Sequence, residues 1–230
     1  EANDDTEMVD LIQEATDNNI PVVTVLGDCP GSKRISYVGM GSYNLGQEYG
    51  NLVCEILQDK QQPKEQYRIV VLMNEGSYDA SQNLVYSGIQ ETVNEKYQGN
   101  AEVLIKTEQI NQRTAFGAEE VVRDIFLSEK ESPDVVICLD EMHTACAYQA
   151  AIDYNKVGEV SILGYYQSET ILNGIDTNVI YATLTVDTYQ MGSSCIHALT
   201  EYEKTGYVSD YMAIETFLIH DKNVSEYIGR

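Results

Sequence analysis

Short apolar runs alternate with longer segments of helical spacing along almost the whole chain. We predict buried strands at the apolar runs, which cover residues 20–25, 68–73, 102–106, 134–139, 160–163 and 179–184. We predict helices at residues 8–16, 43–57, 79–97, 118–127, 141–154, 169–172 and 188–202, with Ser42 as the N-cap of the second. This alternation is typical of an α/β fold with parallel sheets covered by helices on both faces. In such folds ligands bind beyond the carboxyl ends of the strands.

The charge balance excludes two classes of partner. The 230 residues include 14 basic and 37 acidic ones, which gives a formal net charge of −23. A surface this acidic repels phosphate backbones and anionic lipid head groups, so we expect this chain to bind neither nucleic acid nor a membrane surface. Solubility is the simplest role for the charge.

The cysteines and histidines do not form the pattern of a metal or catalytic site. Five cysteines are scattered without a CxxC motif or a Cys/His cluster, so we expect no metal, no cofactor and no catalytic residue. The segment DEMH begins a predicted helix, and we interpret Asp140 and Glu141 as charges that the helix dipole favours. An enzyme that uses Cys29 or this segment is the alternative, which a turnover assay would test.

Three segments carry a resemblance to a known family. They read NNIPVVTVLGDCPGSKRISYVGMGSYNLGQEYG, PDVVICLDEMHTACAYQAAIDYNK and, after ILGYYQSE, YATLTVDTYQMG. In this order they resemble the sugar-type (type I) periplasmic binding proteins of ABC importers, which are related to the ligand-binding core of lactose-repressor-like regulators. The tail FLIHDKNVSEY is similar to the closing strand and final turn of the importer-type members, which favours the secreted branch.

The resemblance implies two doubly wound parallel-sheet lobes joined by three crossings, near residues 40–42, 186–188 and 213–215. The N-terminal lobe would contain residues 1–40 and 187–212, and the C-terminal lobe residues 41–186 and 213–230. The family's N-terminal lobe starts with two further strand–helix units, so this lobe is expected to be incomplete. Either the sequence is trimmed, or another chain supplies the missing strands, or the lobe is reduced. A reduced lobe would expose a sheet edge and an apolar helix face, which offers a surface for a homodimer.

The resemblance also implies a ligand-binding cleft in which the usual sugar-binding groups are replaced. Leu26 and Tyr166 stand where the family has aspartates, and Val85, Leu139 and Val186 stand where it has arginine, asparagine and glutamine. The expected cleft is lined by Leu26, Gly27, Asp28, Tyr78, Val85, Arg113, Leu139, Asp140, Tyr166, Gln167, Val186 and Asp187. Each hydrogen bond lost to a buried sugar hydroxyl costs about 1–3 kcal/mol, against about 8 kcal/mol for micromolar binding.

A less hydroxylated ligand therefore fits this cleft better, either an aromatic one or an anionic one held by Arg113. A one-residue shift in the matching would instead bring Asp28, Asp140 or Gln167 into the polar positions.

We therefore expect an extracytoplasmic solute-binding protein, associated with the periplasm or the cell surface, that binds a small molecule between its lobes for ABC-type uptake. Its partner would be a membrane permease, and the lobes would close by hinge motion. Two alternatives stay open. One is a ligand-sensing ectodomain that works with a membrane sensor protein, and the other is the effector-binding core of a transcription regulator.

Overall fold

The computed structural model describes residues 5–60, 64–74, 80–110, 115–128 and 132–229. The strands are β1 (Val23–Val25), β2 (Ser36–Gly39), β3 (Gln66–Asn74), β4 (Glu102–Ile110), β5 (Val135–Cys138), β6 (Ser161–Tyr165), β7 (Ala182–Val186), β8 (Tyr211–Ala213) and β9 (Thr216–His220). The helices are α1 (Asp5–Asp17), α2 (Ser42–Asp59), α3 (Ala80–Lys96), α4 (Ala115–Leu127), α5 (Glu141–Asp153), α6 (Glu169–Asp176), α7 (Thr188–Thr205) and the short 3-10 helix η1 (Val224–Glu226).

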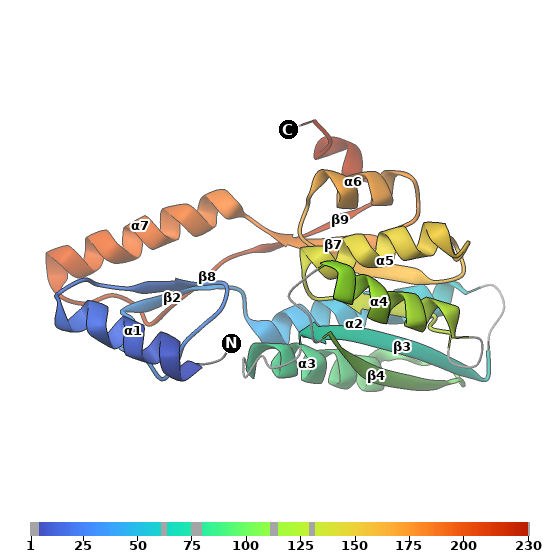
Figure 1. Ribbon diagram of the computed structural model, residues 1–230, viewed down its shortest axis with the longest axis horizontal. Helices are drawn as coiled ribbons and strands as arrows, with labels where there is room; N and C mark the ends of the chain where they lie inside the picture. The colour runs from blue at the N-terminus through green and yellow to red at the C-terminus, as the bar shows by residue number, and fades with distance from the viewer. Residues whose placement is uncertain (1–4, 61–63, 75–79, 111–114, 129–131, 230) are drawn as a thin grey trace.

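These strands form two sheets with helices on both faces (Figure 1). The smaller sheet has the order β1-β2-β8, and the larger sheet has the order β4-β3-β5-β6-β7-β9. The paired strands are parallel except for β7 and β9. The chain passes between the two sheets after β2, after β7 and after β8, which gives the two lobes and three crossings that the family resemblance implies.

The larger sheet is buried on both faces, which explains why its central strands read as continuous apolar runs. In β5, Val136 and Cys138 pack into the core under α4, α5 and α6. Val135 and Ile137 point to the opposite face and pack into a second core under α2 and α3. The period-2 alternation of side chains thus serves two cores at once.

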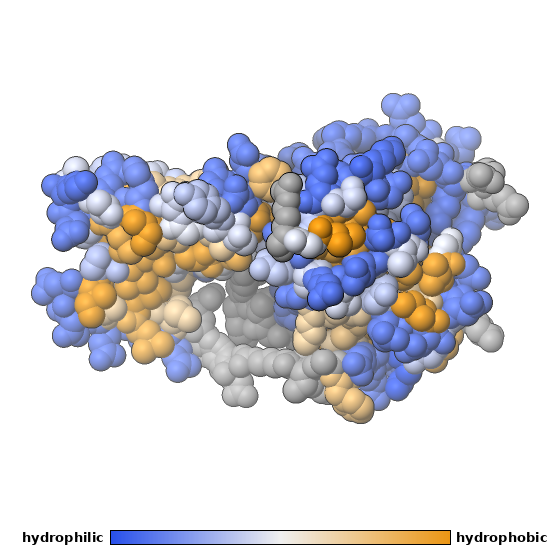
Figure 2. Space-filling view, turned by 90° about the horizontal axis from the view of Figure 1, so that it is seen from above, coloured by the Kyte–Doolittle hydropathy of each residue, from blue (hydrophilic) through white to orange (hydrophobic). Residues whose placement is uncertain are grey.

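The smaller lobe buries much less of its surface. Its sheet lies between α1 on one face and α7 on the other (Figure 1). Although α7 is 18 residues long, Ala198 is its one buried residue, while Ile196 is 66% exposed. Figure 2 shows apolar residues gathered over this lobe. Among the described residues, β1 has a partner on one side only, so an edge of this sheet is open.

Several predicted boundaries differ from those of the structure. The predicted strand over 179–184 begins at Ala182, because α6 extends to Asp176 and the N–H groups of Val179 and Ile180 donate to Gly174 at its end. These apolar residues therefore pack as part of a turn. The N-cap of α2 is Gly41 rather than Ser42, and it makes no side-chain capping hydrogen bond.

Candidate ligand-binding site

The carboxyl ends of the two sheets face each other across the crossings. The chain leaves β2 toward α2 and leaves β7 toward α7, so the ends of strands from both lobes meet in one region (Figure 1). Ligands of parallel α/β folds bind at this end of the strands. This region is therefore where the site should lie.

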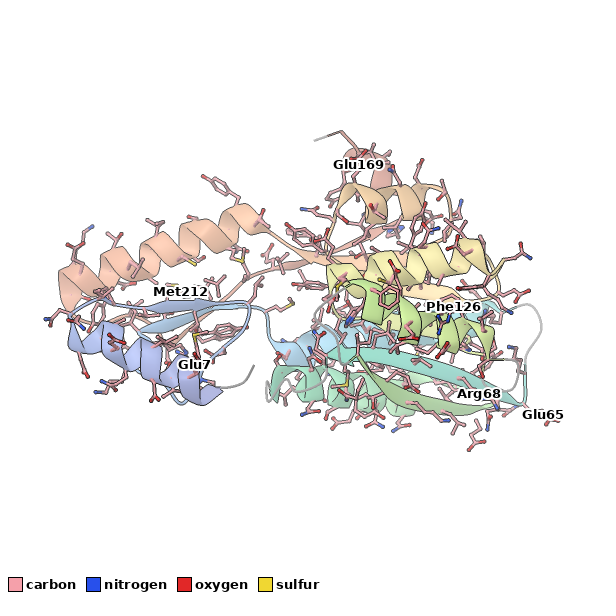
Figure 3. The ribbon with its side chains drawn as sticks, in the orientation of Figure 1. Glu7, Glu65, Arg68, Phe126, Glu169 and Met212 are labelled. Atoms are coloured by element: carbon pink, nitrogen blue, oxygen red, sulfur yellow. The ribbon has the colours of Figure 1, made fainter. Side chains whose placement is uncertain are left out.

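A cavity of about 950 Å³ opens in this region, beside the crossing from β7 to α7. We call it the crossing cavity. It is lined by Tyr166, Gln167, Glu169, Leu172, Asn173, Thr185, Val186, Asp187, Thr188, Tyr189, Phe217, Tyr227, Ile228 and Gly229. The larger lobe supplies the ends of β6 and β7, α6, β9 and the C-terminal segment, and the first turn of α7 supplies the wall on the other side. Figure 3 shows Glu169 on α6, close to the C-terminal turn.

Tyr166 is held in the wall of the crossing cavity by its backbone. It has a φ of +79°, in the left-handed region that a tyrosine rarely adopts. Its N–H donates to Leu184 O at 2.9 Å, and its carbonyl accepts from Thr183 Oγ1 at 2.7 Å. Strain that is fixed on both sides in this way is typical of functional sites. Burial raises the pKa of the neighbouring Tyr165 to about 12, so its hydroxyl stays protonated.

The first turn of α7 is tied to two of the three crossings. Asp187 caps the helix by accepting from the N–H of Gln190 at 2.9 Å. Gln190 Oε1 in turn accepts from the N–H of Glu215, in the link between β8 and β9, at 3.0 Å. The wall that α7 contributes is thus fixed to the segments about which the lobes would move.

The floor of the crossing cavity contains residues that the sequence did not indicate. Thr185 and Phe217 are partners on β7 and β9 and so share a face of the sheet. Thr185 is 2% exposed, and its hydroxyl has no hydrogen-bond partner within the part of the chain that the structure describes. Tyr189 and Tyr227 are also new to the site. The resemblance gave no ligand-binding match in the closing strand or the final turn, so no sequence signal pointed to Phe217 or Tyr227.

Four of the twelve predicted cleft residues line the crossing cavity: Tyr166, Gln167, Val186 and Asp187. Val85 is 4% exposed and lies in the core under α3, and Leu139 packs against the same core. Tyr78 and Arg113 lie outside the described residues.

Asp140 behaves as the sequence predicts, as a helix-terminal charge. Its carboxylate accepts from the N–H of His143 at 2.7 Å and caps α5, and it also accepts from Asn74 Nδ2 at 3.2 Å. The His143 ring is fully buried, and its Nδ1 lies 3.1 Å from Asp140 Oδ2. Burial lowers the pKa of His143, an effect that the nearby Asp140 carboxylate partly opposes. Within the described ranges, no three Cys, His, Asp or Glu side chains are placed to hold a metal ion.

The three predicted residues of the smaller lobe lie apart from the crossing cavity. Leu26 has a φ of +61°, and its carbonyl accepts from Tyr37 Oη at 2.8 Å. Gly27 is exposed beside it. The carboxylate of Asp28 accepts from Arg34 Nη2 at 2.9 Å and from the N–H of Cys29 at 2.8 Å. Asp28 is therefore part of an internal ion pair with Arg34.

Two α/β sheets joined by three crossings, with a cavity beside one crossing, are the architecture of a solute-binding protein. The chain belongs to the periplasmic binding protein domain family, whose model matches residues 1–206. This is a family of extracytoplasmic solute-binding proteins.

Solved structures of this fold include several sugar-binding proteins. GanP, a glucose-galactose binding protein from Geobacillus stearothermophilus, has a TM-score of 0.80 and 22% identity over 95% of this chain and 74% of its own. A solute-binding protein from Burkholderia graminis, in complex with D-arabinose, has a TM-score of 0.81 and 15% identity over 98% of this chain and 75% of its own. The XylFII-LytSN complex contains a chain with a TM-score of 0.73 and 21% identity, over 93% of this chain and 72% of its own.

Comparison with curated protein sequences gives no match. Within the described residues, no helix is both long enough and apolar enough to cross a membrane.

Proposed function

We propose that this chain is an extracytoplasmic solute-binding protein that binds a small molecule at the crossing cavity and delivers it to an ABC-type permease. The observation that supports this most is the position of the cavity in a member of this family. It lies at the carboxyl ends of β6 and β7, and it is walled by segments on both sides of a crossing. No catalytic step forms part of the proposal.

The proposed movement is closure of two lobes about the crossings. The lobes would contain residues 1–40 with 187–212, and residues 41–186 with 213–230. The link from Gln190 to Glu215 makes α7 follow the movement of the β8–β9 connection. A ligand that contacts both α6 and Tyr189 of α7 would therefore stabilise the closed state.

The proposed ligand is less hydroxylated than a hexose or a pentose. Tyr166 and Val186 line the cavity at two positions where the family has polar sugar-binding groups, and neither provides a carboxylate or an amide. Asp28 pairs with Arg34, so a ligand would share its carboxylate with that guanidinium. No lysine, arginine or histidine is among the described residues that line the cavity, so its wall does not favour the anionic ligand that Arg113 would pair with.

Native mass spectrometry of the freshly purified protein tests the proposal, because it detects a retained small molecule and allows it to be identified after denaturation. We expect a bound non-sugar molecule that the Tyr227→Ala variant loses. The Tyr207→Ala variant should keep the molecule, because Tyr207 is 73% exposed and lies outside the cavity. A bound hexose or pentose would contradict the proposed ligand. Equal retention by both variants would contradict the proposed site.

The alternative to delivery to a permease is that a second protein recognises the ligand-bound state of this chain. XylFII, which has this fold, is found in a complex with LytSN. A membrane sensor protein in place of the permease would use the same closure of the lobes.

Association through the smaller lobe is part of the proposal. The exposed apolar residues Leu11 on α1 and Ile196 on α7, together with the open edge of β1, form the surface for a second copy. Sedimentation velocity should show a dimer that the Ile196→Glu change dissociates. A monomer at every accessible concentration would contradict it.

A further inference from the structure

We infer that the crossing cavity selects a cationic ligand, namely a small molecule that carries an ammonium group with at least one N–H next to an apolar part. This inference rests on the proposed function and names the class of ligand. It goes against the anionic ligand that the sequence suggests.

The first argument is the charge of the wall. The lining residues include the carboxylates of Glu169 and Asp187 and, among the described residues, no cationic side chain. An anion placed here would be repelled by these two carboxylates and would find no cation among the described lining residues, in a protein whose net charge is −23. A cation would gain from the same field.

The second argument concerns the helix ends, which could otherwise attract an anion. Both α6 and α7 begin at the cavity, and each N-terminus carries about half a positive charge. Asp187 already caps α7, and Glu169 lies in the first turn of α6. The two carboxylates carry two negative charges, and the two helix N-termini together offset about one of them. The remaining net charge of about −1 matches a ligand with one positive charge.

The third argument is the aromatic wall. Tyr166, Tyr189, Phe217 and Tyr227 all line the cavity. The electron-rich faces of such rings attract ammonium groups, and the attraction grows when the site excludes water. The same rings, with Leu172 and Val186, also provide apolar contacts for the rest of the ligand.

The fourth argument is the unused hydroxyl on the floor. Thr185 is 2% exposed, and its Oγ1 makes no hydrogen bond to any of the described residues. A buried polar atom without a partner is costly and calls for a ligand or a water molecule. A threonine oxygen accepts a hydrogen bond readily from an ammonium N–H. Its Oγ1 is covered in this structure, so an ammonium group among the rings would satisfy Thr185 once the lining side chains move to admit it.

Isothermal titration with three probes of matched shape tests this inference. The probes are the cation phenethylamine, the neutral 2-phenylethanol and the anion 3-phenylpropionate. We expect phenethylamine to bind at least about tenfold more tightly than either of the others at low salt. Equal affinities, a reversed order, or no binding of phenethylamine would overturn the inference.

Two variants test the assigned contacts. Glu169→Gln should weaken phenethylamine by about three- to tenfold, whereas Glu203→Gln should not, because Glu203 is exposed on α7 outside the cavity. Thr185→Val should weaken phenethylamine by about fivefold but leave its N,N,N-trimethyl analogue unchanged, since that analogue has no N–H to donate. If Thr185→Val weakens both compounds equally, the hydroxyl has no role in binding.

The two proposals fail in different ways. A sugar or an anion retained in native mass spectrometry and lost by Tyr227→Ala would overturn the cationic class while the solute-binding function stands. A protein that retains and binds no small molecule would contradict the proposed function itself.

Discussion

Arg34 holds the loop after β1 to the start of β8. Its side chain is 7% exposed and pairs with Asp28 and, through Nη1 at 2.8 Å, with Asp210. Arg34→Met would leave the partly buried Asp28 carboxylate without its cation, so we expect a loss of about 2–3 kcal/mol in the free energy of unfolding. Urea denaturation measures this loss.

Arg123→Met is the matched control. Arg123 is 42% exposed and pairs with Glu120 and Asp124 on the surface of α4. Exposed pairs of this kind contribute about 0–1 kcal/mol. Similar losses for the two variants would show that the burial of Arg34 adds nothing to its ion pairs.

His143 should make stability fall at mildly acidic pH. Burial lowers the pKa of its ring in the folded protein below the ordinary value of 6.5, so the unfolded chain takes up the proton first. Its contribution is therefore complete above about pH 6.5 and is lost as the pH falls below that value. We expect His143→Gln to flatten the dependence of the free energy of unfolding between about pH 6.5 and pH 5. His197→Gln removes an exposed histidine, and an equal flattening by that variant would contradict the assignment.

At the residue scale, the sequence predicts local roles better than distant ones. Asp140 could be recognised as a helix-terminal charge, because a capping residue interacts with the helix that follows it. The pairing of Arg34 with Asp210 joins positions that come together only when β8 pairs with β2. Thr185 gave no signal either, since an alternating strand does not reveal which hydroxyl remains without a partner.

At the element scale, α2 and α3 pack by direct contact of their backbones. A Cβ on Gly46 would lie 2.1 Å from the carbonyl oxygen of Val85 and 3.0 Å from Gly88 Cα. Because backbone atoms cannot move aside as a flexible side chain can, Gly46→Ala must push the helices apart. We expect it to lower the free energy of unfolding by about 3 kcal/mol, measured by urea denaturation.

Gly192→Ala on α7 should have the opposite effect. A Cβ there meets no atom of the described residues within 4 Å, and alanine favours the helix by about 0.5–1 kcal/mol over glycine. A loss of stability in both variants would show that the two glycines are not distinguished by the space around them.

The length and repetition of an element decide how well its sequence reveals it. Helices such as α2 and α7, with 18 residues each, show several turns of apolar spacing and were predicted within a few residues. The strands β2 and β8 have 4 and 3 residues, which is too short for an alternating pattern, and they were not predicted as strands. The smaller sheet was therefore expected from the family resemblance rather than from periodicity.

At the scale of the whole molecule, the same resemblance supplied the arrangement of the lobes. Alternation of strands and helices predicts parallel sheets but does not say how many sheets there are. Only the matched order of segments implied three crossings, and the structure has them after β2, β7 and β8. The resemblance predicted the site less well than the lobes. The crossing cavity includes β9 and the C-terminal segment, for which no ligand contact was expected.

The net charge of −23 sets two electrostatic effects of salt against each other. Salt screens the repulsion among 37 acidic residues, which stabilises the folded protein, and it also weakens the ion pairs, which destabilises it. Pairs such as Arg34–Asp28 and Lys64–Asp134 include a side chain that is 7% or less exposed and so are screened least. The repulsion acts between exposed charges and should dominate.

We expect the midpoint of thermal unfolding at pH 7 to rise by about 3 °C or more between about 10 mM and 300 mM NaCl. Near pH 5, closer to the sequence pI of about 4.2, the rise should shrink because fewer carboxylates are charged. A midpoint that falls with salt at pH 7 would mean that ion pairs, rather than repulsion, control the electrostatic stability of this fold.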